Sequence, residues 1–324
     1  MVPLSIVPAS IPSPPVEWQV PISIPIGQWL PFLGTSTVIS IHMYALCILV
    51  GIIVAIWMTE VRLRRRGVEP WAIIDVVIWA VPLGIIGARV WHVLTHPTDF
   101  FYPGADPWAV IRIWDGGGAI FGSIVFGALG VWIGCRISGL RFLTVADAIA
   151  PGLLLAQACG RIGNWFNHEI FGLPTTLPWG LEIESTNPAF PVGLPEGTLF
   201  HPTFLYEMIW NVIGAALLLF LGSRLHLQWG KVFALYLIWY GIGRAWLEAI
   251  RLDPSEILLG LRINDWGAIA AIAFGLAIWI VQSVRHPGRE ASPYRPGREW
   301  QPKGSAVDSD DTYSDADFAP TTAK

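Results

Sequence analysis

Seven apolar runs dominate this sequence and restrict how the chain can fold. The hydrocarbon core of a bilayer is about 30 Å thick, and a helix of about 20 apolar residues crosses it. Because no water reaches the backbone there, only helices and closed β-barrels satisfy its polar groups. We therefore expect an all-α, polytopic integral membrane protein with seven transmembrane helices. The runs cover residues 36–58, 71–94, 118–136, 145–159, 204–221, 232–247 and 263–284.

Composition agrees with membrane spans and excludes several other classes. Charged residues make up 14% of the chain, whereas soluble proteins carry about a quarter. The net charge of −4 and the dispersed or juxtamembrane placement of the arginines argue against nucleic-acid binding. Cys47, Cys135 and Cys159 lie in or beside apolar runs without a CxxC partner, so we expect neither a disulfide nor a metal site. We expect no cofactor either.

Basic residues between the runs predict the orientation. They concentrate in alternate connections, and cytoplasmic loops are the ones enriched in Arg and Lys. These residues are Arg62, Arg64, Arg65, Arg66, Arg136, Arg141, Arg224, Lys231, Arg285, Arg289, Arg295 and Arg298. The intervening connections hold Arg112, Arg161, Arg251 and Arg262. We therefore expect a multi-pass plasma-membrane protein with an extracytoplasmic N-terminus and a cytoplasmic C-terminus.

Three regions follow from this pattern. Residues 1–35 are proline-rich and contain no Lys or Arg, which predicts an extracytoplasmic segment without the basic start of a cleavable signal peptide. Residues 36–284 form the membrane domain, with a small extracytoplasmic cap at about 163–202. Residues 285–324 are polar with an acidic stretch, which predicts a disordered cytoplasmic tail.

A charged motif follows the fourth run directly. Residues 160–169 read Gly-Arg-Ile-Gly-Asn-Trp-Phe-Asn-His-Glu. Arg161 keeps its proton at any physiological pH, and at the edge of hydrocarbon it needs an anionic partner. A phospholipid phosphate is the commonest anion at that depth. The motif therefore predicts a lipid-headgroup site.

A polar stripe on the sixth run allows two interpretations. Tyr236, Tyr240, Arg244, Glu248 and Arg251 recur at helical spacing, so they share one face. Polar faces inside a membrane usually border a cavity. The stripe either shares an anion site with the arginine of the fourth run or forms an internal Arg244–Glu248 ion pair that holds helices together.

Polar residues in three other runs are further candidates. Arg89 and His92 share a face of the second run with His96. Glu207 lies inside the fifth run, where it needs a cationic partner, and His201 precedes that run. Tyr44, at the start of the first run, is typical of an interfacial anchor or of a substrate contact.

The ordered set of these motifs covers about residues 36–284. The motifs are Gly160-Arg161-Ile162-Gly163-Asn164 with Asn167, Glu169 and Gly172; His201-Pro202-Thr203-x-Leu205-Tyr206-Glu207; Tyr240-Gly241-x-x-Arg244 with Glu248 and Arg251; Gly87-Ala88-Arg89; Ala146-Asp147-x-Ile149-Ala150-Pro151; and His42-x-Tyr44. Together they resemble the bacterial prolipoprotein diacylglyceryl transferase family.

The resemblance implies a membrane enzyme that moves diacylglyceryl from phosphatidylglycerol to the cysteine thiol of a lipobox-containing prolipoprotein and releases glycerol phosphate. It implies that Arg161 contacts phosphatidylglycerol and that Arg244 is the second essential arginine. Around them it implies Tyr44, Asn164, Gly172, Tyr240 and Glu248. We place Arg161, Arg244, His201 and Glu248 in the catalytic group. We also expect Glu169, Glu207, Arg89 and Arg251 at the phosphatidylglycerol site.

One position departs from the family pattern. Phe121 stands in the Gly-rich entry to the third run where the family often carries a histidine that is a proposed base. Either no side-chain base is needed, because nearby cations lower the pKa of the substrate thiol, or another histidine serves. The candidates are His42, His92, His168 and His201, with His201 favoured for its place at the mouth of the fifth run.

Three other classes are weighed against this interpretation. A transporter or channel for an anionic lipid or solute would line a pathway with the polar stripes, but it predicts repeat symmetry, and we find no internal repeat. An intramembrane protease would need a nucleophile such as Ser123 or Asp147 in a protease motif, which neither has. A structural scaffold leaves the Gly-Arg-Ile-Gly-Asn motif without a role.

Overall fold

The computed structural model describes residues 10–18, 20–25, 28–29, 39–113, 117–252 and 257–301. In these residues an α-helix lies at the position of each predicted run, so the mostly helical fold is confirmed. The helices are α1 (Met43–Arg64), α2 (Ala72–Thr95), α3 (Ile120–Ile137), α4 (Phe142–Phe166), α5 (Thr203–Arg224), α6 (Lys231–Glu248) and α7 (Ile263–Arg285). Short 3-10 helices lie at Val16–Trp18, Pro97–Asp99 and Pro107–Ile111.

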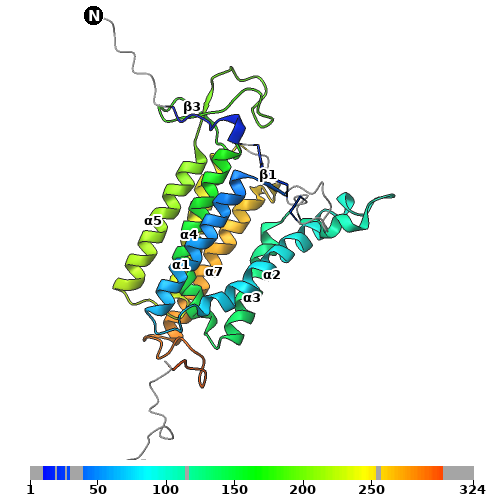
Figure 1. Cartoon of the computed structure of the whole chain (residues 1–324). Helices are drawn as coiled ribbons and strands as arrows, with labels where there is room; N and C mark the ends of the chain where they lie inside the picture. The colour runs from blue at the N-terminus through cyan, green and yellow to red at the C-terminus, as the bar shows by residue number, and fades with distance from the viewer. Residues whose placement is uncertain are drawn as a thin grey trace, which may run out of the picture.

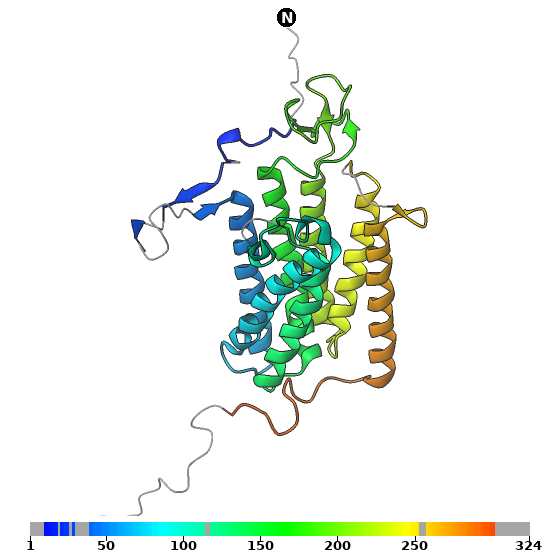
Figure 2. The ribbon, with the colours of Figure 1, turned by 90° about the vertical axis from the view of Figure 1, so that its right-hand side faces the viewer.

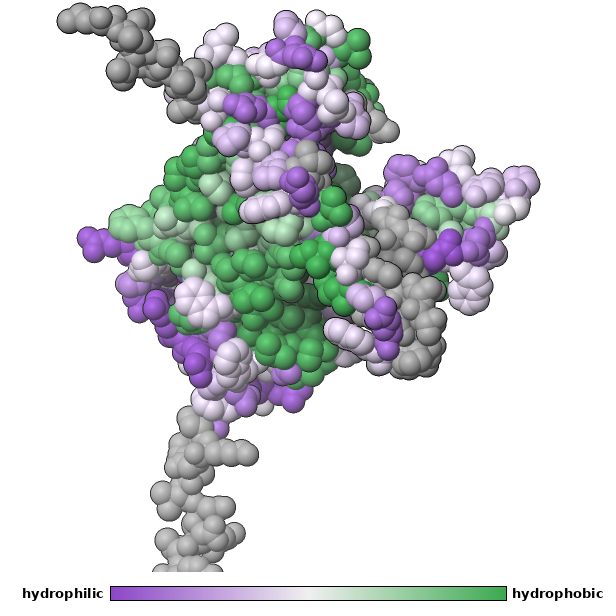
Figure 3. Space-filling view, turned by 45° about the horizontal axis from the view of Figure 1, so that its top comes forward, coloured by the Kyte–Doolittle hydropathy of each residue, from purple (hydrophilic) through white to green (hydrophobic). Residues whose placement is uncertain are grey.

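Six of the seven helices are long and apolar enough to cross a membrane. The exception is α6, whose 18 residues include three charged ones, Lys231, Arg244 and Glu248. Apolar side chains gather over the helices, while hydrophilic residues gather toward the ends of the bundle (Figure 3). This distribution matches a band of hydrocarbon around the middle of the bundle.

The helices are arranged around α4, which is the most buried of the six. It packs against α1, α5 and α6, and α7 in turn packs against α6. The α2–α3 hairpin makes most of its helix contacts within itself and leans away from the other helices (Figure 1).

Glycines let neighbouring helix backbones touch, which is a common way to pack helices in membranes. A Cβ atom on Gly122 of α3 would lie 2.0 Å from the carbonyl oxygen of Gly87 of α2. One on Gly163 of α4 would lie 2.6 Å from Cδ2 of Tyr44 on α1. The second contact holds Tyr44 directly against the Gly-Arg motif.

The predicted boundaries of the first and fourth runs need correction. Helix α1 begins at Met43, because β2 (Ile39–Ile41) precedes it and pairs antiparallel with β1 (Ile22–Ile24). The first three residues of the predicted run, 36–38, lie outside the described residues. Helix α4 is longer than predicted and continues through the Gly-Arg motif to Phe166.

Ser123 and Asp147, the two residues considered for a protease, have structural contacts. The carboxylate of Asp147 on α4 accepts hydrogen bonds from the backbone N–H groups of Gly230 (2.8 Å) and Phe233 (3.0 Å). It therefore caps the first turn of α6 from a different helix. The hydroxyl of Ser123 donates to the carbonyl oxygen of Gly84 at 2.9 Å and joins α3 to α2.

Residues 167–202, here the sheet unit, cover one end of the bundle (Figure 2). Three short antiparallel strands in the order β3-β5-β4 form its frame: β3 (Pro174–Thr175), β5 (Leu199–Phe200) and β4 (Leu181–Glu182). Phe171, Ile183 and Phe200 are buried in its core. The N-terminal segment joins it, since Ile11 bridges to Leu181. A further hairpin, β6 (Ile257–Leu258) and β7 (Leu261–Arg262), leads into α7.

Residues 286–301, here the C-terminal strap, pack across the opposite end of the bundle. Tyr294 of the strap forms an antiparallel β-bridge with Leu140. The Tyr294 hydroxyl accepts a hydrogen bond from the backbone N–H of Glu69 at 2.8 Å. Tyr294 is 4% exposed, and burial raises the pKa of its hydroxyl. The aromatic residues of this part of the tail pack against the core beneath α1–α4. Residues 302–324 lie outside the described part of the chain.

Candidate active site

Five helices bring polar residues to the end of the bundle that carries the sheet unit. Arg161 belongs to the last turns of α4, Glu207 to the first turns of α5, and Glu248 ends α6. Asn264 starts α7, and Tyr44 starts α1. We call Arg161, Arg244, Arg251, Arg262, Glu207 and Glu248 the arginine cluster.

Arg161 pairs with Glu207, the carboxylate for which the sequence predicted a cationic partner. Its Nε lies 2.5 Å from Oε2 of Glu207, and Glu207 is 6% exposed. Its Nη1 donates to Oδ1 of Asn164 at 3.3 Å. Because these contacts fix the guanidinium from two sides, its plane is set before any ligand arrives.

A short hydrogen-bonded chain continues from Arg161 toward the sheet unit. The carboxamide of Asn164, itself 5% exposed, donates to Oε1 of Glu169 at 2.8 Å. Asn167 donates to the same oxygen at 3.1 Å. The two carboxamides and the carboxylate of the motif are thus brought together as one network with Arg161. The charges of Glu169 and Arg161 both act on the hydroxyl of Tyr44.

Glu248 is the centre of the other half of the cluster. It is 1% exposed, and Nη2 of Arg244 lies 2.8 Å from its Oε2. Arg262 contacts its other oxygen through Nε at 3.0 Å, and Arg251 lies 3.9 Å away. A buried carboxylate shared among several cations is one of the few ways in which such a charge is stabilised in a membrane.

Glu207 connects the two halves. It forms an ion pair with Arg161, and its charge also acts on Arg244, with which it forms no ion pair in the described residues. The described contacts include none directly between Arg161 and Arg244. The Arg244–Glu248 ion pair considered from the sequence is present.

Both arginines keep hydrogen-bond donors for a ligand. A guanidinium has five N–H groups. In the described part of the chain, Nη2 of Arg161 and Nε and Nη1 of Arg244 make no hydrogen bond, while Oε1 of Glu207 is buried without one. Guanidinium groups with donors to spare are suited to the oxygens of a phosphate.

Gly172 and His201 meet where the sheet unit joins the helices. The N–H of Gly172 donates to the carbonyl oxygen of His201 at 2.9 Å, and Gly172 bridges to Arg251. A Cβ atom on Gly172 would lie 2.8 Å from the carbonyl oxygen of Ile250. This crossing of three segments has room only for glycine. The ring of His201 lies 3.2 Å from the Tyr206 hydroxyl.

Three other residues singled out in the sequence make contacts near their own helices. Arg89 donates to the carbonyl oxygens of Ala109, Val110 and Gly117, so it anchors the loop between α2 and α3. Tyr240 stacks on Tyr236, with ring centroids 6.2 Å apart. Phe121 is 44% exposed and lies against Trp91 of α2.

Two members of the site were not found from the sequence. Asn264 donates to Oε1 of Glu248 at 2.9 Å, and Arg262 also donates to the carbonyl oxygen of Glu248 at 3.1 Å. Both lie where β7 ends and α7 begins. A polar pair at the start of an apolar run was the available signal, but it is also the usual composition of a membrane boundary.

A cavity of about 450 Å³ adjoins this end of the bundle, beside the hydrogen-bonded chain. It is lined by Asn167, His168, Glu169, Glu184, Thr186, Asn187, Pro188 and Ala189. Both ring nitrogens of His168 are engaged, by Glu184 and by the carbonyl oxygen of Pro14. In the described residues, no three His, Cys, Asp or Glu side chains converge as a metal site requires.

Fold and site together define a helical, multi-pass membrane protein with a buried cluster of arginines and glutamates at one end. The family model for prolipoprotein diacylglyceryl transferase matches residues 31–281. The chain belongs to this family.

Similar proteins agree along most of the chain. A phosphatidylglycerol–prolipoprotein diacylglyceryl transferase of Leifsonia xyli subsp. xyli is 58% identical over 311 residues, covering 94% of this chain and 90% of the relative. The enzyme of that name from Bifidobacterium adolescentis is 49% identical over 75% of each chain. The one from Paenarthrobacter aurescens is 46% identical over 82% of this chain and 86% of its own.

Proposed function

We propose that this protein transfers the diacylglyceryl group of phosphatidylglycerol to the thiol of the lipobox cysteine in a prolipoprotein. The products are a thioether-linked lipoprotein precursor and glycerol phosphate. Family membership and the names of the relatives support the reaction and its two substrates. They favour an enzyme over a transporter or channel. The observation that carries the site assignment is that Arg161 and Arg244, each paired with a buried glutamate, lie at the same end of the bundle.

The topology that we propose has seven spans, with α6 as the seventh. In support, α6 packs against α4, α5 and α7, and the side chains of its Arg244 and Glu248 are largely buried. An odd number of spans puts the two termini on opposite sides. The positive-inside rule then puts the sheet unit outside the cell, as a cap on the membrane domain, and the C-terminal strap in the cytoplasm.

The chemistry is an alkyl transfer. The cysteine sulfur attacks the carbon of the diacylglyceryl group that is bonded to the phosphate. The bond between this carbon and the phosphate oxygen breaks, its electron pair stays on that oxygen, and glycerol phosphate departs. Charge grows on the departing phosphate oxygen, and donors fixed in advance stabilise such charge best. Nη2 of Arg161 and the Nε and Nη1 groups of Arg244 are the donors that we assign to this task.

The thiol must also lose its proton. Cations beside a thiol lower its pKa from about 8.5 and favour the thiolate. Oε1 of Glu207, buried without a hydrogen bond beside Arg161, is a further acceptor for that proton. His201 remains a candidate base, whereas His168 has both ring nitrogens occupied.

The remaining residues are proposed to position the substrates. Asn164 and Glu169 orient Arg161 through the hydrogen-bonded chain, and Tyr44 closes the α1 side. Glu248 holds Arg244 in place. Gly172 fixes the junction with the sheet unit, whose adjoining cavity is placed to receive part of the peptide substrate.

The test uses purified protein with phosphatidylglycerol labelled in its acyl chains and a lipobox peptide. We expect label to appear on the peptide through its cysteine, and none on a peptide with serine in that position. Arg161→Ala should abolish transfer in protein that still inserts into the membrane. Transfer by that variant at the wild-type rate would refute the phosphate role of Arg161.

A further inference from the structure

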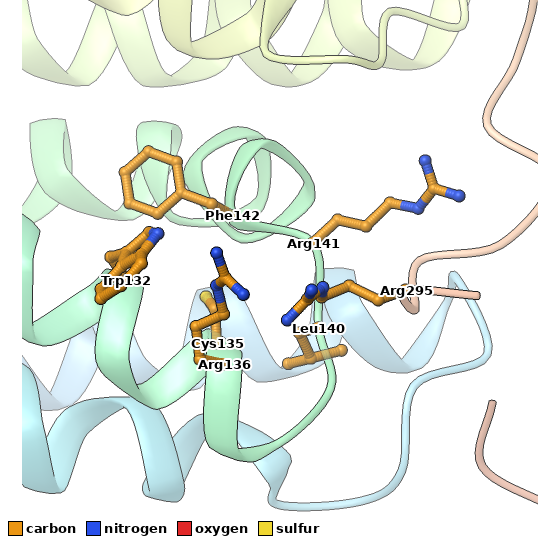
Figure 4. Close-up of a pocket in the computed structure, with 7 residues that line it drawn as sticks. All are labelled: Trp132, Cys135, Arg136, Leu140, Arg141, Phe142 and Arg295. Carbon is orange, nitrogen blue, oxygen red and sulfur yellow. The ribbon is translucent and has the colours of Figure 1, made fainter. Parts of the chain in front are cut away.

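A second group of arginines surrounds a cavity at the end of the bundle opposite the arginine cluster. The cavity measures about 260 Å³ and lies between the end of α3, the start of α4 and the C-terminal strap (Figure 4). Its lining residues are Trp132, Cys135, Arg136, Leu140, Arg141, Phe142 and Arg295. No acidic side chain is among them.

Two of the three arginines are directed at the same space. Arg136 and Arg295 extend their guanidinium groups toward each other from α3 and from the strap, while Arg141 points away (Figure 4). Arg141 is occupied elsewhere, since its Nε donates to the carbonyl oxygen of Tyr294 at 2.7 Å. Arg136 rests its guanidinium over the Trp132 ring at 4.9 Å. Within the described part of the chain, neither Arg136 nor Arg295 forms an ion pair.

The backbone of the strap keeps this pair of cations together. The N–H of Arg295 donates to the carbonyl oxygen of Gly139 at 2.8 Å. A second backbone bond joins the same two segments: the N–H of Arg141 donates to the carbonyl oxygen of Pro293 at 2.9 Å. Two like charges directed at the same space repel one another, and an anion between them would relieve that repulsion.

An apolar stripe on α3 leads to the cavity. Phe121, Val125, Leu129 and Trp132 recur at helical spacing with Arg136, so all five share one face. The four apolar side chains are 44%, 55%, 45% and 45% exposed, in that order. The stripe is therefore an exposed apolar face of α3 that leads to Trp132 and to the cavity with Arg136 and Arg295.

We propose that this cavity binds the phosphate of an anionic phospholipid in the leaflet at that end, with Arg136 and Arg295 on the phosphate and an acyl chain along α3. Basic pockets between membrane helices are a recurring type of lipid-headgroup site. The apolar track favours a lipid over a free phosphate compound, because only a lipid would cover both the arginines and the stripe. The site is separate from the arginine cluster and does not depend on the proposed reaction.

A phosphatidylglycerol carrying a photoactivatable acyl chain tests the proposal on the full-length protein in lipid nanodiscs. After illumination, digestion and mass spectrometry report the crosslinked peptides. We expect crosslinks within Ile120–Ile137. Arg136→Gln combined with Arg295→Gln should weaken them about 30-fold, since an arginine near a membrane surface is worth about a fivefold change in binding of an anionic lipid.

Arg224→Gln is the matched control, because Arg224 is an exposed arginine at the same end of the bundle. It should leave the α3 crosslinks unchanged. Excess glycerol phosphate should not compete, whereas excess unlabelled phosphatidylglycerol should. Equal crosslinking in the double variant, an equal loss in the Arg224 variant, or full competition by glycerol phosphate would each overturn the proposal. Crosslinks near α4 and α6 report on the proposed reaction site and are scored separately.

Discussion

Replacing Arg244 with lysine separates the geometry of its guanidinium group from its charge. In the structure, Nη2 of Arg244 is committed to Glu248 at 2.8 Å, and Nε and Nη1 are left for a substrate phosphate. A lysine keeps one positive charge, but it has a single ammonium that the carboxylate already attracts. The variant therefore retains the ion pair and loses the planar fork.

The expected loss follows from one charge-assisted hydrogen bond, which is worth about 1.5–3 kcal/mol. With about 1.4 kcal/mol for each factor of ten, kcat/KM should fall about 10- to 150-fold. Because charge on the phosphate grows as the C–O bond breaks, most of the loss should lie in kcat rather than in KM.

The assay is the transfer of labelled diacylglyceryl to a lipobox peptide, measured over a range of phosphatidylglycerol concentrations. Arg224→Lys serves as a control for the same exchange at an exposed position away from the cluster. Equal kcat/KM for Arg244→Lys and wild type would refute the reasoning, since a point charge would then suffice.

Three further predictions concern the structure that positions the site. Gly172→Ala should lose activity and about 1–3 kcal/mol of stability by overpacking, measured by chemical unfolding, whereas Gly267→Ala, with open space around its Cβ position, should match wild type. Asp147→Ala should cost about 0.5–2 kcal/mol, as for a lost helix cap, and thermal unfolding would show it while activity at low temperature persists; an unchanged midpoint would contradict the capping role. Tyr294→Phe should cost about 1 kcal/mol through the lost backbone hydrogen bond, and hydrogen exchange at the Glu69 amide should rise.

The helices could be predicted because their signal is local. Run length and apolarity place most helices within a few residues, except at both ends of α1 and at the end of α4, and the charged motif on α4 was recognisable by the cost of a cation near hydrocarbon. The need of Glu207 for an arginine partner followed from the same argument, and the structure supplies Arg161.

Contacts made between distant segments could not be predicted in the same way. The sharing of Glu248 among Arg244, Arg251 and Arg262 depends on how α6 meets the hairpin before α7. The packing of the C-terminal strap depends on Tyr294 finding a core built by four other segments. The hydrogen bonds of Arg89 to the loop that follows α2 likewise depend on how that loop folds back on the helix.

The most direct test of the account is an experimental structure with phosphatidylglycerol bound in a bilayer mimic. We expect its phosphate oxygens within hydrogen-bonding distance of Nη2 of Arg161 and of Nε or Nη1 of Arg244, with Glu207 beside them. A phosphate bound elsewhere, with both arginines still satisfied only by their glutamates, would contradict the claim that these two side chains hold one lipid phosphate.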